Sequence, residues 1–271
     1  MSNTNPKRKV LLLAGGLGSR LKPLTDVVPK CLIEIAGKPL LDYWFDRFEL
    51  AQLFDVRINN HHLPQLVRDY IVRRNDDGVF NVTEAYEPTL LGSAGTVHAN
   101  RDFVSEDDLC VIVYADNLSN VNLDAMIAFH QSHDDPFTML LFRAENPKKS
   151  GIATLDDDSR VIDFVEKPEH PASDLANAGI YVLDGKAYLE IADMNVFDLG
   201  FDVLPKFIGR MRGWEWQGYH RDIGTHASLE QAKHDIAEVF AWAHQDPLFF
   251  WIVMARSSAR FITFVILIWW N

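Results

Sequence analysis

Three cations follow a glycine-rich turn near the start of the chain. The run VLLLAGGLGSRLKPLTDVVPK, residues 10–30, contains an apolar strand, three glycines within four residues, and then Arg20, Lys22 and Lys30. Glycine lets backbone N–H groups approach an anion closely, and nearby cations can neutralise it. An isolated glycine turn is more often a tight turn with solvated cations. Because Pro29 and Lys30 follow in the same segment, the sequence favours a triphosphate site over that alternative.

Two common phosphate-binding motifs do not fit this turn. The dinucleotide pattern G-x-G-x-x-G would begin at Gly16 and Gly18, but Leu21 stands at its third glycine position. The Walker pattern is absent as well, because no Gly-Lys-Ser/Thr follows after a four-residue gap. Hydride transfer and P-loop hydrolysis are therefore disfavoured.

Polar residues also follow a buried strand in the middle of the chain. The run LCVIVY, residues 109–114, is continuous, apolar and β-branched, which is typical of a central strand, and Asp116 and Asn117 come just after it. Open α/β sheets bind ligands beyond the carboxyl ends of their strands. Asp116 and the later Asp222 also have a structural interpretation, because an isolated Asp before a turn commonly caps that turn.

These segments occur in the order seen in a known family. Over residues 9–236 the chain resembles the sugar-1-phosphate nucleotidylyltransferases, whose signature looks like LLLAGGLGSRLKPLT with the following PK. The other matching segments are the base-binding loop LGSAGTV (91–97), the metal-binding strand end YADN (114–117), the sugar-phosphate motif EKP (166–168), the sugar-contacting strand NAGIY (177–181) and the second metal motif DIGT (222–225).

The resemblance implies a specific reaction. The phosphate oxygen of a sugar 1-phosphate attacks the α-phosphorus of a nucleoside triphosphate in line, and pyrophosphate leaves. Because the nucleophile is already an anion, the site must position and neutralise charge and needs no general base. Asp116 and Asp222 would share one Mg²⁺ through oxygen ligands. The charged residues implied as catalytic are Arg20, Lys30, Asp116, Lys167 and Asp222.

Binding roles follow from the same resemblance. Arg20 and Lys30 would neutralise the β- and γ-phosphates and the departing pyrophosphate, and Lys167 would hold the attacking phosphate. The nucleotide-binding residues implied are Leu13, Ala14, Gly15, Gly16, Glu87 and Gly92. The sugar-phosphate-binding residues implied are Asn117, Gly151, Glu166, Lys167 and Asn177. The chain departs from the family with Ser19 for a usual Thr and Ala115 for a usual Gly, and neither change removes a charge.

Guanine is favoured as the base. LGSAGTV with the following HAN and RDF is most similar to the mannose-1-phosphate and heptose-1-phosphate guanylyltransferases, which serve nucleotide-sugar and cell-surface polysaccharide biosynthesis. The carboxylate of Glu87 can accept hydrogen bonds from the N1 and N2 donors of guanine, whereas uracil or thymine offers one N–H. Uridylyl, thymidylyl and cytidylyl transfer stay open.

Three other classes of function compete with this interpretation. A non-catalytic, nucleotide-sugar-binding regulatory subunit should lack one of the charged residues, and all are present. A metal-dependent glycosyltransferase would not need Arg20 and Lys30 beside the glycine turn. A molybdopterin guanylyltransferase would leave the EKP and NAGIY segments unexplained.

Alternating strands and helices are expected to position these residues. The alternation predicts a Rossmann-like, three-layer α/β/α fold with a mixed, mostly parallel sheet, the nucleotide-diphospho-sugar transferase fold of the family. Short β-type runs between residues 151 and 183 predict a small antiparallel sugar-binding layer. Expected strands are 9–14, 56–59, 80–85, 109–114, 138–143 and 214–220, and expected helices are 39–52, 64–74, 93–101, 123–131, 198–210 and one beginning near Thr225 or Ser228.

Composition limits the partners and the compartment. With 271 residues and 48% hydrophobic content the chain can bury a large core, and its net charge of −12 argues against nucleic acid as a partner. Cys31 and Cys110 lie in or beside apolar runs, so buried thiols in a reducing compartment are expected. The N-terminal MSNTNPKRK lacks the apolar run of a signal peptide, so a cytoplasmic location is the default.

The last residues differ in character from the rest. We expect a nucleotidyltransferase domain over residues 1–243, monomeric or homo-oligomeric, and an atypical hydrophobic tail over 244–271. Its two apolar runs of about ten residues are split by Arg256 and Arg260, and each is too short to span a bilayer. The tail is interpreted as an interfacial anchor, a docking helix or non-native read-through, with the last favoured; membrane contact is expected only if the tail is native.

Overall fold

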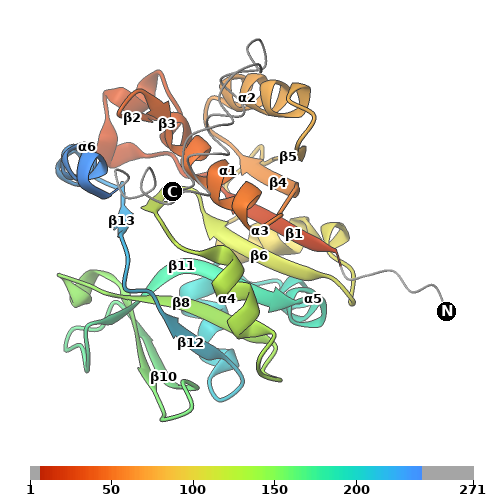
Figure 1. Cartoon of the computed structure of the whole chain (residues 1–271), viewed down its shortest axis with the longest axis vertical. Coiled ribbons are helices and arrows are strands. Elements are labelled where there is room, and N and C mark those ends of the chain that lie inside the picture. Colours follow the sequence, from red (N-terminus) through yellow and green to blue (C-terminus); the bar gives the residue numbers. More distant parts are fainter. Residues whose placement is uncertain (1–6, 240–271) are drawn as a thin grey trace, which may run out of the picture.

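A nine-stranded sheet forms the centre of the computed structural model, which describes residues 7–239 (Figure 1). The spatial order is β10-β9-β11-β6-β1-β4-β5, and β8 and β12 extend the sheet from β11. These strands are β1 (Arg8–Leu13), β4 (Asp55–Asn60), β5 (Asn81–Tyr86), β6 (Leu109–Tyr114), β8 (Phe137–Arg143), β9 (Gly151–Leu155), β10 (Val161–Glu166), β11 (Leu175–Asp184) and β12 (Arg212–Glu215).

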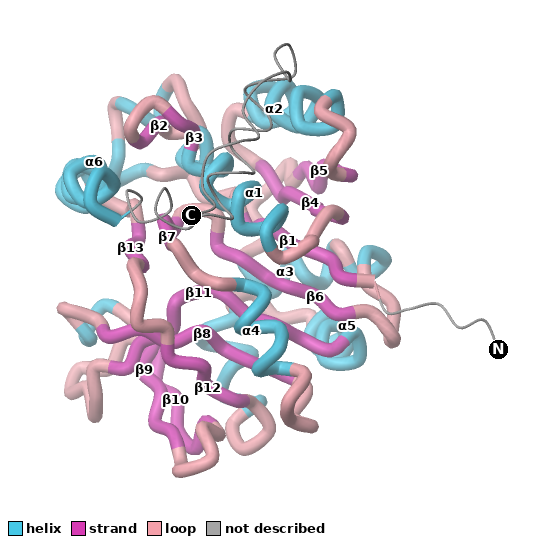
Figure 2. Tube along the Cα trace, in the orientation of Figure 1, coloured by secondary structure: helices cyan, strands magenta, loops and turns pink. Residues whose placement is uncertain are grey.

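Helices cover both faces of the parallel part of the sheet (Figure 2). They are α1 (Leu40–Leu50), α2 (Pro64–Asp76), α3 (Ser93–Ala99), α4 (Leu123–His130) and α5 (Gly185–Met194). Val10 and Leu12 of β1 pack in one core with α1, α2 and α4, and Leu11 and Leu13 pack in the other with α3 and α5. Because β1 pairs in parallel with β4 and β6 and is buried on both faces, its apolar run is continuous. The predicted three-layer α/β/α fold is confirmed.

β11 joins the parallel part of the sheet to an antiparallel part. It pairs antiparallel with β6 and β8, while β9 and β10 form an antiparallel hairpin. β9 meets β11 at the pair Ala176 and Ile152. The antiparallel strands predicted between residues 151 and 183 are therefore present, and they continue the main sheet instead of forming a detached layer.

A two-stranded ribbon links distant parts of the chain. Its strands are β7 (Asn117–Ser119) and β13 (His220–Asp222), which pair antiparallel. A smaller ribbon is formed by β2 (Glu34–Ile35) and β3 (Lys38–Pro39). Helix α6 (His226–Val239) follows β13, and its start is capped because Ser228 N donates to Thr225 Oγ1 and Thr225 N donates to Ser228 Oγ. The predicted helix start is confirmed.

The strand predicted over residues 214–220 is wrong. β12 ends at Glu215 and β13 begins at His220, so the segment is two strands that belong to different sheets. Asn120 contacts the segment between the two strands: its Oδ1 accepts hydrogen bonds from Trp216 Nε1 at 3.1 Å and Tyr219 N at 2.8 Å. The amide thereby holds the turn between the two strands.

The helix predicted over residues 198–210 is present only in part, as two short helical turns over residues 199–207. The segment forms a π-helical turn, η6 (Leu199–Val203), followed by a 3-10 turn, η7 (Leu204–Phe207). Pro205 has no N–H to donate and disfavours a regular α-helix here. Asp198 stands at the start of η6 and accepts a hydrogen bond from Phe201 N at 2.9 Å.

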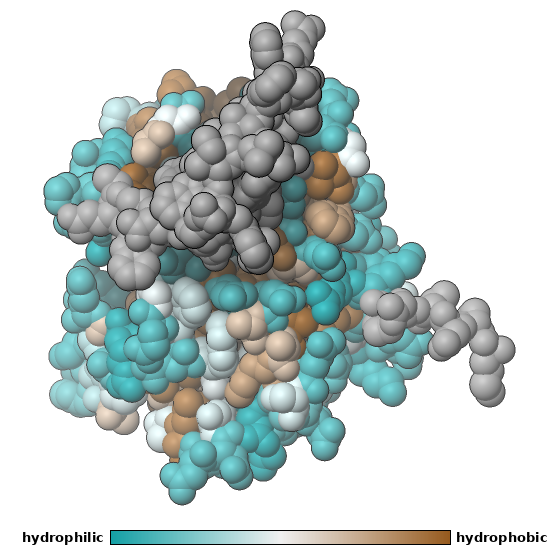
Figure 3. Space-filling model, in the orientation of Figure 1, coloured by the Kyte–Doolittle hydropathy of each residue, from teal (hydrophilic) through white to brown (hydrophobic). Residues whose placement is uncertain are grey.

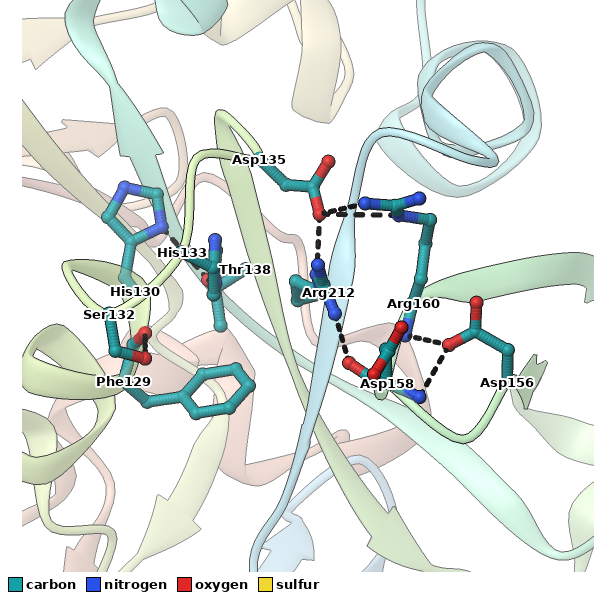
Figure 4. A network of polar contacts seen from close by, with 10 residues as sticks. All are labelled: Phe129, His130, Ser132, His133, Asp135, Thr138, Asp156, Asp158, Arg160 and Arg212. Atoms are coloured by element: carbon teal, nitrogen blue, oxygen red, sulfur yellow. Dashed lines mark hydrogen bonds and ion pairs between the residues drawn. The ribbon is translucent and has the colours of Figure 1, made fainter.

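Charged side chains join the starts of β8, β10 and β12 in what we call the Asp135 cluster (Asp135, Asp156, Asp158, Arg160 and Arg212; Figure 4). Asp135 Oδ2 accepts hydrogen bonds from Arg160 and Arg212, and Arg212 also donates to the carbonyl of Asp158. Asp156 Oδ1 accepts from the main-chain N of Asp158 and of Arg160. Burial opposes ionisation, but the two guanidinium groups lower the pKa of Asp135.

The remaining predictions concern the surface and the chain ends. In the view of Figure 3, most of the described surface is hydrophilic. Cys31 and Cys110 are buried free thiols, as predicted. None of the helices between residues 7 and 239 has the length and apolar content needed to cross a membrane. The predicted tail, residues 244–271, and the boundary before it lie outside the described residues.

Candidate active site

Two cavities meet at the carboxyl ends of the central strands. Cavity A, of about 270 Å³, lies against the glycine turn after β1, and cavity B, of about 260 Å³, lies against β9, β10 and β11. Tyr114 and Asp116 line both cavities. Cavity A holds every residue predicted to bind the nucleotide: Leu13, Ala14, Gly15, Gly16, Glu87 and Gly92. Cavity B holds every residue predicted to bind the sugar phosphate: Asn117, Gly151, Glu166, Lys167 and Asn177.

One lysine and two carboxylates form a cluster where the cavities meet, which we call the Lys30 cluster (Lys30, Asp116 and Asp222). Lys30 Nζ lies 2.7 Å from Asp116 Oδ2 and 3.3 Å from Asp222 Oδ1. Lys30 is buried, whereas the side chains of Asp116 and Asp222 are 38% and 59% exposed. Two partly exposed negative charges and one buried positive charge therefore meet at the junction of the cavities.

The β7–β13 ribbon brings the two carboxylates together. In its register Asp222 pairs with Asn117, and Ile223 N donates to the carbonyl of Asp116 at 2.9 Å. Asp116 and Asp222 are thus neighbours although 106 positions separate them in the sequence. The ribbon is the element that assembles the predicted metal site.

Arg20 lies beside Asp222 on the solvent side. Gly224 makes room for both groups, because a Cβ at Gly224 would lie 2.8 Å from Arg20 Nη2 and 2.9 Å from each Asp222 carboxylate oxygen. Partial burial raises the pKa of Asp222, and Lys30 and Arg20 oppose that rise. Because more than half of the Asp222 side chain is exposed, we take it as ionised at neutral pH.

Asn59 of β4 organises the glycine turn. Its Oδ1 accepts hydrogen bonds from Ala14 N at 2.5 Å and Gly15 N at 3.2 Å. Two of the backbone N–H groups expected to approach an anion are therefore already engaged within the protein. Gly16 is exposed, and a Cβ there would meet no heavy atom within 4 Å, so the turn is open to a ligand at that residue.

Glu87 is a buried carboxylate in the wall of cavity A. Its Oε1 accepts hydrogen bonds from Asn59 Nδ2 and Thr96 Oγ1, and its Oε2 accepts a long one from Leu91 N at 3.3 Å. Asn59 thus ties the glycine turn to Glu87. Sequence reasoning missed Asn59, whose only signal was a polar residue at the end of a predicted strand, and it included Thr96 only as part of the base-binding loop 91–97.

Lys167 and Glu166 are adjacent in cavity B. Burial raises the pKa of Glu166, and the ammonium of Lys167, 3.5 Å from its Oε1, opposes that rise. Lys167 has a φ of 49°, in the left-handed region that a lysine rarely adopts, and its N–H donates to the carbonyl of Ser150. Backbone strain of this kind is found at functional sites. Lys149 also lines the cavity and adds a second cation.

The two asparagines of cavity B already have partners in the protein. Asn177 Nδ2 donates to Tyr181 Oη at 2.8 Å, and its Oδ1 accepts from Gly179 N. Asn117 is buried, and its Nδ2 donates to the carbonyl of Ala178 at 3.0 Å. Asn117 therefore joins β7 to β11 as well as lining the cavity.

The Lys30 cluster suits Mg²⁺, which needs few protein ligands, better than it suits a metal that is bound only by protein side chains. Among residues 7–239 no group of three or more His, Cys, Asp or Glu side chains converges on one point. Mg²⁺ is commonly bound by one or two carboxylates, with substrate phosphates and water completing its octahedron. Asp116 and Asp222 supply such a pair beside the cavity where a triphosphate would lie.

Comparisons with known proteins give relatives over most of the chain. A family model described as nucleotidyl transferase matches residues 9–239. Mannose-1-phosphate guanyltransferase of Neurospora crassa is 27% identical over 221 residues, which cover 80% of this chain. Glucose-1-phosphate thymidylyltransferase of Xanthomonas campestris pv. campestris is 30% identical over 248 residues, covering 86% of this chain and 82% of that protein.

A solved structure matches the fold as well. The crystal structure of HddC from Yersinia pseudotuberculosis aligns with a TM-score of 0.70 at 24% identity, over 84% of this chain and 99% of that chain. The match to the Neurospora guanyltransferase spans only 60% of the length of that protein.

Proposed function

Because this chain belongs to the nucleotidyl transferase family, we propose that it transfers a nucleoside monophosphate from a nucleoside triphosphate to a sugar 1-phosphate, giving a nucleotide sugar and pyrophosphate. GTP is the favoured donor, and a mannose- or heptose-type 1-phosphate the favoured acceptor. The observation that carries the proposal is the pair of cavities that share Asp116, with Lys30 and Asp222 at their junction.

The chain's own residues would act by position and charge. Cavity A takes the triphosphate, with Arg20 and Lys30 neutralising the charge that leaves with pyrophosphate. Cavity B takes the sugar 1-phosphate, with Lys149 and Lys167 holding the attacking phosphate. Asp116 and Asp222 would hold Mg²⁺, which would supply further charge neutralisation on the reacting phosphates. Since both substrates would meet at Asp116, the attacking oxygen would lie close to the α-phosphorus.

Glu87 supports guanine as the base. It lines cavity A, and among residues 7–239 its Oε2 accepts only the long bond from Leu91 N, so that oxygen has capacity for a ligand donor. The names of the relatives divide between guanyl and thymidylyl transfer. The proposal of GTP therefore rests on Glu87, and the other nucleotides are alternatives for the same site.

A substrate matrix tests the proposal. Each of the common nucleoside triphosphates is combined with mannose, glucose and heptose 1-phosphates, with Mg²⁺ and with a chelator, and pyrophosphate release is measured. We expect release that needs Mg²⁺ and is fastest with GTP. Glu87→Gln should reduce the preference for GTP over dTTP. Nucleotide-sugar binding with no pyrophosphate release from any pair would instead identify a regulatory subunit.

A further inference from the structure

Asp198 lies in cavity B and was not singled out by the sequence. Its position at the start of η6 is fixed by its neighbours: Oδ1 accepts from Phe201 N at 2.9 Å, and Oδ2 accepts from Ser93 Oγ at 3.3 Å. Its own N–H donates to Asp202 Oδ2 at 2.8 Å. The carboxylate is therefore oriented by Phe201 in the same turn and by Ser93 at the start of α3.

Glu166 approaches the same small space from β10. Gly200 lies between the two carboxylates, and a Cβ there would be 2.8 Å from Glu166 Oε2 and 3.2 Å from Asp198 Oδ1. Any residue with a side chain at 200 would displace them. Glycine at this position thus lets two acidic groups from distant segments face the same part of cavity B.

The two acids are not equally neutralised. Glu166 has Lys167 at 3.5 Å, whereas within residues 7–239 Asp198 forms no ion pair. Burial raises the pKa of Glu166, and the nearby Asp198 adds to the rise. Negative charge is therefore concentrated at this end of the cavity. A ligand that fits it must bring hydrogen-bond donors and no negative charge of its own.

We propose that Asp198 is a specificity-determining residue, which together with Glu166 accepts hydrogen bonds from two hydroxyls of the sugar and selects neutral, polyhydroxylated sugar 1-phosphates over acidic ones. The inference rests on the proposed function, because it assigns the sugar to cavity B. The phosphate of the acceptor would lie toward Lys149 and Lys167, and the sugar ring toward the two acids.

The variant Asp198→Asn tests this proposal with little change of shape. Asn keeps an oxygen that can accept from Phe201 N, and so preserves the start of η6. Asp202→Asn is the matched control, because Asp202 is an acid in the same segment that accepts from Phe197 N and Asp198 N but does not line cavity B. Both variants remove one negative charge from the same turn.

Steady-state kinetics are measured with the best nucleotide and three kinds of acceptor: a hexose 1-phosphate, its monodeoxy analogues, and glucuronic acid 1-phosphate. Asp198→Asn should raise KM for the neutral hexose 1-phosphate about tenfold, as for one lost charge-assisted hydrogen bond, and leave KM for the nucleotide within twofold. The effect should vanish for one deoxy analogue, and the preference for neutral over acidic sugar should narrow. Asp202→Asn should show none of these changes.

Equal losses with every deoxy analogue, an unchanged preference against the acidic sugar, or a raised KM for the nucleotide would overturn the assignment of Asp198. Calorimetric titration of the same sugar 1-phosphates keeps the two proposals apart. If no acceptor is turned over, the proposed reaction is refuted, yet the titration still tests whether Asp198 selects the sugar. In that case selectivity for neutral sugar 1-phosphates that is lost in Asp198→Asn, and kept in Asp202→Asn, supports the role of Asp198.

Discussion

The Lys30 cluster and the Asp135 cluster are centred on side chains of opposite charge. In the Asp135 cluster, one carboxylate accepts hydrogen bonds from two arginines (Figure 4). In the Lys30 cluster, one ammonium lies between two carboxylates. Both clusters tie together segments that are distant in the sequence, so connectivity alone does not separate a structural cluster from a functional one.

Exposure and charge balance do distinguish the structural cluster from the functional one. The side chain of Asp135 is 13% exposed, and its negative charge is more than matched by Arg160 and Arg212. Asp116 lines both cavities, Asp222 lines cavity B, and the two carboxylates share a single buried lysine. Asp135 is neutralised within the protein, whereas Asp116 and Asp222 keep partly exposed oxygens that a divalent cation can bind. Variants of the two clusters should therefore affect different properties.

The largest expected effect is on catalysis at Asp222. Asp222→Asn keeps the shape of the side chain and removes one carboxylate charge from the Lys30 cluster, so we expect kcat to fall about a thousandfold, or about 4 kcal/mol. Pyrophosphate release measures the rate, and calorimetry should show a melting temperature within a few degrees of the wild type. Near-normal pyrophosphate release would remove Asp222 from the catalytic groups.

A somewhat smaller effect on catalysis is expected at Arg20. Arg20→Ala removes a cation that lies beside Asp222, and kcat should fall about a hundredfold, or about 2.7 kcal/mol. Lys22→Ala is the matched control, because Lys22 is an exposed cation of the same turn, paired with Asp26 on the surface. Similar losses in the two variants would indicate a general effect of net charge on the turn.

A substitution in the Asp135 cluster should lower the stability of the protein and leave its catalytic rate unchanged. Arg212→Met removes one of the two guanidinium groups and leaves Arg160, so the free energy of unfolding should fall by about 2 kcal/mol. Urea denaturation measures this loss, and kcat of the folded variant should stay within twofold of the wild type. A large fall in kcat without loss of stability would contradict the distinction between the clusters.

The smallest expected effect is a pH dependence near the same cluster. His130 is buried, and burial lowers its pKa below the usual value although Asp184 opposes the shift. The unfolded chain therefore takes up a proton near pH 6.5 that the folded protein excludes, so stability is lost as pH falls below about 6.5, by at most about 1.4 kcal/mol per pH unit for this residue.

Urea denaturation at pH 7.5 and pH 5.0 checks this sign. His130→Gln should be less stable than the wild type at pH 7.5, because His130 contacts Thr138 Oγ1 and Asp184 (the histidine and Thr138 are drawn in Figure 4). Its further loss of stability at pH 5.0 should be smaller than that of the wild type. An equal loss in both proteins would show that another group is responsible.

The sequence predicted local features of the fold well because they depend on local patterns. The predicted strand 109–114 has the same first and last residues as β6. Helix α6 begins at the cap formed by Thr225 and Ser228, as expected. The helix predicted over 198–210 forms only as two short helical turns, because Pro205 lies within the segment. The strand predicted over 214–220 is wrong because contacts with a distant residue interrupt it. Asn120, about 100 positions away in the sequence, binds the middle of segment 214–220 and interrupts the strand there. No pattern within residues 214–220 indicates this interruption.

The candidate site shows the same division. The grouping of predicted residues into cavities A and B follows motifs that lie within short segments of the sequence. Asn59 and Asp198 were missed because each is defined by contacts across the fold, with the glycine turn in one case and with Ser93 in the other. Their roles become apparent only when strands far apart in the chain are brought together.

The β7–β13 ribbon also has a consequence for synthesis on the ribosome. The ribosome makes the chain from its N-terminus, and a domain generally folds as a unit. The glycine turn, β6 and Asp116 are made early, but Asp222 pairs with Asn117 only after more than a hundred further residues have emerged. A nascent or prematurely ended chain thus contains the glycine turn of cavity A but lacks the second carboxylate of the Lys30 cluster. Catalytic competence is therefore tied to near-complete translation of the described domain.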